Sequence, residues 1–235
     1  SAESSHMSSH ISNQISNQSN SDKAVIVIIG GTSGIGAALA RQLTIDNQIV
    51  HVASRQTGVD VADEQSVNRF FESIGAFDHL VITAGSSAPA GKVVDVDFQQ
   101  AKAAFDTKFW GSINATKQAV RYIKQGGSIT LTTGMLSRKV VANTYVKSTM
   151  NAALEAFTKV LAKELAPIRV NAVSPGLTRT GSMPAQTAMY EQAKATLPVA
   201  KVGEPRDIAM AYYLAMNNSF MTGAIIDVDG GALIS

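Results

Sequence analysis

Short apolar runs alternate along the chain with longer segments in which apolar residues recur at helical spacing. The runs are rich in Val and Ile at consecutive positions, which is typical of parallel strands that helices cover on both faces. They predict strands at residues 24–29, 49–53, 79–83, 128–132, 169–173 and 224–228. The longer segments predict helices at residues 35–44, 64–73, 98–124, 145–165, 185–196 and 207–215. This alternation predicts a three-layer α/β fold, with helices on both faces of a doubly wound parallel sheet.

The first 22 residues differ in composition from the rest of the chain. They include nine Ser together with Asn and Gln, and the segment Ser5-His6-Met7 is typical of a cloning scar. Such a segment has too little apolar surface to bury a core of its own. We therefore expect a low-complexity tail over residues 1–22, in part derived from cloning, and a single domain over residues 23–235.

Composition and charge narrow the range of functions. The 235 residues carry a net charge of +2, which provides no broad cationic field for a nucleic-acid backbone. No apolar run has the length of a membrane span, and the N-terminus lacks a basic region followed by an apolar one. Because the chain has no Cys, disulfides and thiolate metal sites are excluded. We expect a cytoplasmic protein that uses no metal and binds neither nucleic acid nor membranes.

A glycine-rich segment connects the first predicted strand to the first predicted helix. Its sequence is Gly30-Gly31-Thr32-Ser33-Gly34-Ile35-Gly36. Glycines in this context permit a tight turn and let a pyrophosphate approach backbone amides at the helix N-terminus. The segment therefore predicts a Rossmann-type dinucleotide site, with contacts from Gly30, Thr32, Ser33, Gly34, Ile35 and Gly36. A plain strand-to-helix turn is the alternative.

The Gly-x-x-x-Gly-x-Gly spacing resembles that of the short-chain dehydrogenase/reductase family. Further landmarks of the family recur in order, at residues 83–85, 168–176, 180, 202–209, 222–223 and 228–231. Two positions depart from its pattern, because this chain has Ile29 where the family has Thr and Thr83 where it has Asn. The resemblance implies a nicotinamide cofactor, with further contacts from Ala84, Gly85, Pro175, Gly176, Thr178 and Thr180.

The end of the second predicted strand bears on the choice of cofactor. Family members that use NAD(H) tend to carry an acidic residue there, whereas Ser54 and Arg55 resemble the type that uses NADP(H). A guanidinium offers a planar fork of donors to a 2′-phosphate. We expect NADP(H) as the cofactor in preference to NAD(H), with Asp60 and Val61 near the adenine. A solvated loop arginine is the alternative for Arg55.

Only residues 56–59 separate Arg55 from Asp60, at a point where the family inserts a helix and another strand. A parallel crossover needs about a dozen residues, so this βα unit is missing. We therefore expect six parallel strands, with residues 49–53 as the exposed edge.

The catalytic positions depart from the family's pattern. The resemblance implies a Tyr that protonates the carbonyl, a Lys four residues later, a Ser that holds the substrate and an Asn on the preceding helix. The register of the chain places Lys147 at the Tyr position and Asn151 at the Lys position. It places Gly134 at the Ser position, with Thr133 beside it, and Lys108 at the Asn position.

Two residues are candidates for the missing proton donor. Tyr145 is followed four residues later by Thr149, so no ammonium on the same helix face lowers its pKa. Lys147 is the stronger candidate. If Lys108 shares its pocket, repulsion and burial lower the pKa of one amine, which gives an acid near neutrality or a Schiff-base nucleophile. Alternatively, both amines point to solvent or bind an anionic group.

These observations predict an NADP(H)-dependent oxidoreductase of the short-chain type that acts on a small carbonyl or alcohol compound through a non-standard proton donor. Ordinary aldehydes and ketones should react slowly or undetectably. The alternative is a catalytically silent NADP(H)-binding sensor or scaffold. The resemblance also implies a homodimer or homotetramer, assembled through the two long helices predicted at 98–124 and 145–165.

Overall fold

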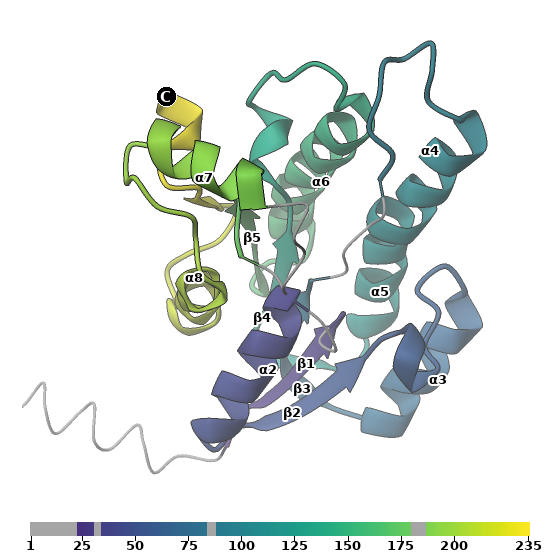
Figure 1. Ribbon diagram of the computed structural model, residues 1–235. Helices are drawn as coiled ribbons and strands as arrows, with labels where there is room; N and C mark the ends of the chain where they lie inside the picture. The colour runs from purple at the N-terminus through teal and green to yellow at the C-terminus, as the bar shows by residue number, and fades with distance from the viewer. Residues whose placement is uncertain (1–22, 31–33, 84–87, 180–186) are drawn as a thin grey trace, which may run out of the picture.

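Six parallel strands form one sheet in the computed structural model, which describes residues 23–30, 34–83, 88–179 and 187–235 (Figure 1). The strand order is β2-β1-β3-β4-β5-β6, and each neighbouring pair is parallel. The strands are β1 (Val25–Ile29), β2 (Ile49–Ala53), β3 (Phe77–Ile82), β4 (Ile123–Thr132), β5 (Arg169–Pro175) and β6 (Ile225–Val228). The predicted fold class and the predicted number of strands are confirmed.

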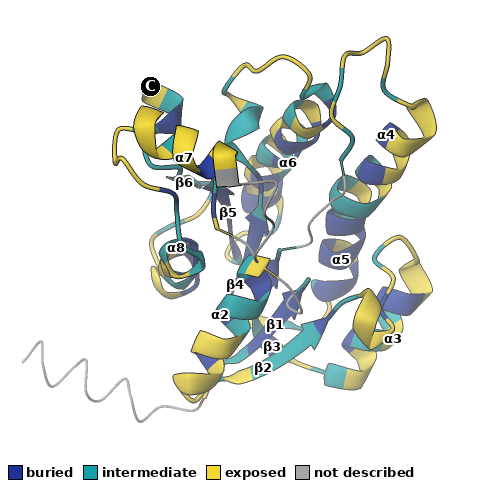
Figure 2. Cartoon of the chain, in the orientation of Figure 1, coloured by how far each residue is buried: buried dark blue, intermediate teal, exposed yellow. Residues whose placement is uncertain are grey.

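Helices cover both faces of the sheet and complete three layers. On one face, α2 (Gly34–Ile45) and α8 (Pro205–Asn217) bury Leu39 and Tyr212 against the sheet residues Ile28 and Val173. On the other face lie α3 (Glu64–Ile74), α5 (Gly111–Ala119) and α6 (Tyr145–Glu164). Figure 2 shows the largely buried central strands between helices whose outer sides are exposed. In the described part of the chain, no helix is both long and apolar enough to cross a membrane.

Strand β2 lies at the edge of the sheet, as expected for the missing βα unit. A single 3-10 turn (Arg55–Thr57) follows it, and the chain then leads into α3. Ser54 begins this turn by accepting a hydrogen bond from the amide of Gln56, and Gly58 ends it in the left-handed conformation with φ of 85°. The short connection thus stays at the carboxyl end of the sheet, where β2 ends.

The helix predicted at 98–124 is wrong in two respects. It consists of α4 (Phe98–Phe105), a π-helical turn (Asp106–Trp110) and α5, which ends at Ala119. The last two residues of the predicted helix, 123 and 124, belong instead to β4, because Ile123 pairs with Phe77 of β3. Strand β4 consequently begins five residues before its predicted start. The other elements agree with prediction to within two residues at each described end. The last helix before α8, α7, spans Thr187–Thr196, and the predicted tail 1–22 lies outside the described residues.

Arg169, the first residue of β5, binds the C-terminal end of α8. Its buried guanidinium donates hydrogen bonds to the carbonyl oxygens of Ala215 at 2.6 Å, Met216 at 2.7 Å and Met221 at 3.1 Å. Carbonyls at the C-terminal end of a helix lack intrahelical partners, so a charged donor stabilises them.

Replacing this cation should therefore destabilise the fold. We expect Arg169→Met to lower the free energy of unfolding by about 1.5 to 3 kcal/mol, because charged hydrogen bonds to buried carbonyls are lost. Urea denaturation measures the change, with Arg41→Met on the exposed side of α2 as the control, which should stay within about 0.5 kcal/mol of wild type. Equal stability of Arg169→Met and the control would contradict this role.

Candidate functional site

The predicted site residues gather at one edge of the sheet. Gly30 follows β1, Arg55 follows β2 after Ser54, Thr133 follows β4 and Gly176 follows β5. Because all the strands are parallel, their carboxyl ends meet at the same edge. The chain places β2 on one side of β1 and β3 on the other, so the strand order changes direction at β1. Ligands of open α/β sheets bind at such a switch point.

The glycine-rich segment has the backbone that a tight turn requires. Gly30 and Gly34 have φ values of 91° and 53°, in the region that favours glycine. The amide of Gly30 donates to the carbonyl of Ala53 at 2.7 Å, which ties the turn to the end of β2. Helix α2 begins at Gly34 and has no acidic residue in its first turn, so nothing there repels an anion. Ile35 and Gly36 pack inward, whereas Gly31, Thr32 and Ser33 lie outside the described residues.

Arg55 is exposed beside this turn. Its guanidinium makes no hydrogen bond or ion pair with the residues that the structure describes. The Oγ of Ser54 accepts a hydrogen bond from the Gln56 amide at 3.2 Å, which leaves the hydroxyl proton available for donation. Both groups can therefore contact a phosphate at the end of β2.

Residues of α3 and α5 hold the loop that contains Asp60 and Val61. The amide of Asp60 donates to Ser66 Oγ at 3.0 Å, and the carbonyl of Val61 accepts from Asn114 Nδ2 at 2.8 Å. Gly111 lies against Val61, since a Cβ there would stand 2.7 Å from Val61 Cγ2. The Asp60 carboxylate is exposed and accepts only from the amide of Ala62 in the described residues. Sequence reasoning missed the supports from Asn114 and Gly111, because they come from α5.

The segment after β5 is closely packed. A Cβ on Gly176 would stand 2.7 Å from the Cα of Asp229, so the position requires glycine. Thr178 is buried and donates to the carbonyl of Gly176 at 3.0 Å. Pro175 is the last residue of β5. The other predicted cofactor contacts lie outside the described residues, namely Ala84, Gly85 and Thr180.

A lysine and an asparagine meet at the predicted catalytic positions. The ammonium of Lys108 donates to Asn151 Oδ1 at 2.7 Å and approaches the carbonyl of Thr133 at 3.4 Å. Lys108 lies on the π-helical turn between α4 and α5, and such turns are frequent at functional sites. Gly134 leaves the space for this pair, because a Cβ there would stand 2.8 Å from Asn151 Nδ2. The side chain of Asn151 thus occupies the space that a side chain at position 134 would take, where the family's pattern has a Ser.

Burial, and to a smaller extent the positive charge of Lys147, lower the pKa of Lys108 from its ordinary value of 10.5 to about 8. Lys147 stands four residues before Asn151 on α6, so both project from one face of the helix. Its side chain is exposed. The sequence alone leaves open which of the two lysines has a lowered pKa, and the structure assigns it to Lys108.

Tyr145 is half-buried at the start of α6. Its ring packs against the apolar cluster that α4 forms with Val146, including Ala101 and Ala104. Its carbonyl accepts a hydrogen bond from Thr149 Oγ1 at 2.7 Å. Tyr145 thus faces α4, whereas Lys108 contacts both Asn151 and the carbonyl of Thr133.

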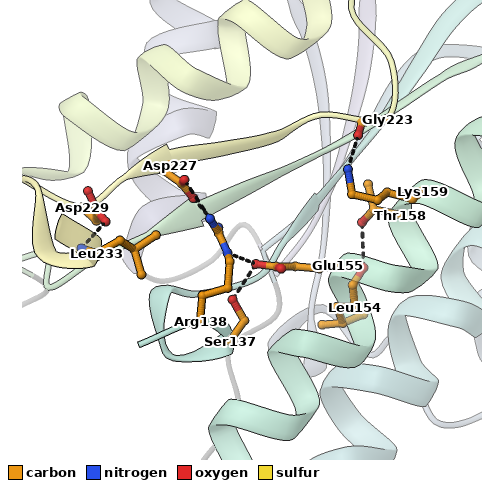
Figure 3. A network of polar contacts seen from close by, with 10 residues as sticks. All are labelled: Ser137, Arg138, Leu154, Glu155, Thr158, Lys159, Gly223, Asp227, Asp229 and Leu233. Carbon is orange, nitrogen blue, oxygen red and sulfur yellow. Dashed lines mark hydrogen bonds and ion pairs between the residues drawn. The ribbon is translucent and has the colours of Figure 1, made fainter. Parts of the chain in front are cut away.

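The loop that follows Gly134 is anchored on two sides (Figure 3). Ser137 Oγ donates to Glu155 Oε1 at 2.5 Å, and Arg138 Nε donates to the same oxygen at 3.2 Å. Arg138 also binds both carboxylate oxygens of Asp227 on β6. Glu155 lies one helical turn after Asn151, so this network fixes the loop next to the Lys108–Asn151 pair. No local sequence pattern predicts this network, because Arg138 and Asp227 are 89 positions apart.

The lowered pKa of Lys108 can be measured directly. In NMR titrations of ¹³C-methylated lysines, the Lys108 signal should titrate near pH 8 in the wild type, because its burial disfavours the charged form. Lys147→Met removes a like charge and should raise that pKa, while Lys163→Met at the exposed far end of α6 should leave it unchanged. A Lys108 signal that titrates above pH 10, or one that ignores Lys147→Met, would refute the coupling.

Comparisons with known proteins agree with this geometry. A family model described as enoyl-(acyl carrier protein) reductase matches residues 40–232. A short-chain dehydrogenase/reductase of Stachybotrys chlorohalonatus is 34% identical, with 89% of this chain and 96% of the relative covered. Carbonyl reductase family member 4 of Danio rerio is 33% identical, with 87% and 96% covered. A solved small-chain dehydrogenase in complex with NADPH is 67% identical, with a TM-score of 0.88 and with 91% of this chain and 100% of that chain covered. The chain therefore belongs to the short-chain dehydrogenase/reductase family of oxidoreductases.

Proposed function

We propose that this protein is an NADP(H)-dependent reductase of small carbonyl compounds, and in reverse an oxidoreductase of the corresponding alcohols, with the Lys108 ammonium as proton donor. The hydrogen bond between Lys108 Nζ and Asn151 Oδ1 carries the proposal. This bond holds an amine with a pKa of about 8 at the carboxyl end of β4. The residues expected to bind the dinucleotide lie at the same edge of the sheet.

The residues of the β1 and β2 ends fit NADP(H). The glycines of the turn and the N-terminus of α2 suit a pyrophosphate, and Ser54 and Arg55 suit a 2′-phosphate. No carboxylate stands at the end of β2 to favour NAD(H). The 67% identical dehydrogenase in complex with NADPH supports the same choice. When bound, NADPH supplies the hydride, and the protein supplies the position and the proton.

Lys108 fits the role of general acid because acids with a pKa close to the working pH are the most efficient. Asn151 fixes its Nζ, and the Thr133 carbonyl accepts a second N–H, so the third proton is free for a substrate oxygen. Thr133 Oγ1 is buried and has no hydrogen-bond partner in the described part of the chain, so it can hold the same oxygen. Lys147 and Tyr145 are the competing donors.

A catalytically silent NADP(H)-binding sensor or scaffold is the second candidate, and turnover distinguishes it from the enzyme. The exposed side chains of Phe98 and Trp110 on the α4–α5 segment and of Val160 on α6 support assembly into a homodimer or homotetramer. A cytoplasmic location and a small-molecule substrate belong to the same proposal.

The cofactor preference should depend on Arg55. We expect NADPH to bind more tightly than NADH by about 1 to 3 kcal/mol, since the guanidinium makes charged hydrogen bonds to the 2′-phosphate. Fluorescence titration measures both affinities. Arg55→Ala should remove most of the preference, and Arg69→Ala on the exposed side of α3 should retain it. Equal affinities in the wild type, or a preference that survives Arg55→Ala, would remove the argument.

Catalysis should follow the charge state of Lys108. The rate of NADPH oxidation should fall as pH rises through about 8, because the proton donor is lost. Lys108→Met should lower the rate roughly 10²- to 10⁴-fold and remove this pH dependence. Lys147→Met should shift the decline to higher pH, and Tyr145→Phe should have little effect.

Other outcomes would reassign the donor. If Lys147→Met abolishes turnover while Lys108→Met does not, Lys147 is the acid. If Tyr145→Phe abolishes it, Tyr145 reaches the substrate. Tight NADPH binding with no oxidation by any carbonyl compound would favour the silent sensor.

A further inference from the structure

Two lysines at the site affect each other without a carboxylate beside them in the described part of the chain. Lys108 is bonded to a neutral amide and a carbonyl, and among the described residues the charge that affects its pKa is that of Lys147. Lys147 forms no ion pair with any residue in the described ranges. A partly buried ammonium without a counter-charge is unfavourable, so this arrangement is suited to an anion that arrives from outside.

In the described residues, no carboxylate makes an ion pair or hydrogen bond with Lys108 or Lys147. Glu155 is the acidic residue that follows on the same face of α6, and it is already bound by Ser137 and Arg138. The segments 31–33, 84–87 and 180–186, which adjoin the strand ends, contain no Asp or Glu in their sequences. These three segments therefore contribute no negative charge.

A hydroxyl is available at the same place. Thr133 is only 2% exposed, and its Oγ1 has no hydrogen-bond partner in the described residues. Its neighbour Thr132 contacts Tyr212 of α8, and side chains alternate along a strand, so Thr133 faces the other side, where α5 and α6 lie. Lys108 and Asn151 come from that side, and Lys108 contacts the Thr133 carbonyl. The Thr133 hydroxyl and the Lys108 ammonium thus lie at the carboxyl end of β4, and Lys147 stands one helical turn before Asn151 on α6.

The phosphates of the proposed cofactor have their own places. The glycine turn and Arg55 follow β1 and β2, whereas Thr133 follows β4. In the order β2-β1-β3-β4, these ends are two and three strands away, or roughly 10 and 14 Å at the usual strand spacing. The anion at the lysines is therefore a different group from the cofactor's phosphates.

We propose that Lys147, next to Lys108, binds an anionic group, a carboxylate or a phosphate, that the substrate carries beside the reacting carbonyl that Lys108 and Thr133 hold. This inference rests on the proposed function and narrows its substrate class to anionic carbonyl compounds such as 2-oxo acids or phosphorylated ketones. It also explains why neutral aldehydes and ketones should be poor substrates.

The kinetic test compares matched pairs, pyruvate with methyl pyruvate and dihydroxyacetone phosphate with dihydroxyacetone. The ester is the more reactive ketone, so the informative quantity is the ratio of kcat/KM for the anionic and the neutral partner in each variant. Lys147→Met should lower this ratio roughly 10- to 100-fold for at least one pair, because one charged contact is lost. Lys163→Met, on the same helix but exposed at its far end, should leave the ratio unchanged.

A binding test separates this inference from the proposed function. Calorimetry at low salt should show oxalate or inorganic phosphate binding to the NADP⁺-saturated protein, about tenfold or more weakly in Lys147→Met and unchanged in Lys163→Met. Binding of this kind without any carbonyl reduction would support the anion site and refute the proposed function. Reduction of neutral ketones with the same ratio in wild type and Lys147→Met, and no binding of either anion, would overturn the anion site and leave the function standing.

Discussion

The hydrogen bond from Lys108 to Asn151 connects the elements on which the site depends. It joins the π-helical turn before α5 to α6, and the same ammonium approaches the carbonyl of Thr133, the residue after β4. The bond needs the missing Cβ of Gly134, and the loop after Gly134 is fixed in turn by Arg138 and Glu155. A change at any of these points would move the ammonium relative to the sheet edge.

The pair also explains how the family's scaffold is retained while its usual catalytic positions are altered. By register, the lysine stands where the pattern has an asparagine and the asparagine where it has a lysine. In this chain an ammonium and an amide are in contact between the π-helical turn and α6. Because the ammonium of Lys108 is buried, its pKa is lowered to about 8. The exposed Lys147 adds a second positive charge at the position where the family's pattern has a tyrosine.

Much of this was accessible from the sequence, because hydrophobic periodicity and glycine spacing are local signals. They predicted the six parallel strands and the edge position of β2, and the resemblance placed Lys108 and Asn151 among the candidate site residues. The π-helical turn could not be predicted, since it depends on how α4 and α5 pack and leaves no mark on the apolar pattern. Tyr122 and Ile123 fit a helix or a strand equally well by hydropathy, and only the pairing of Ile123 with Phe77 decides for β4. The network of Arg138 and Asp227 joins distant segments, which no local pattern reveals.

The central claim is that Lys108 is the group that faces the reacting oxygen. A crystal structure of the protein with NADP⁺ and oxamate, a mimic of a 2-oxo acid, tests it most directly. The account predicts that Lys108 Nζ lies about 3 Å from the ligand's carbonyl oxygen while it remains bonded to Asn151. A ligand held by the Tyr145 hydroxyl, with Lys108 turned away from it, would contradict the account.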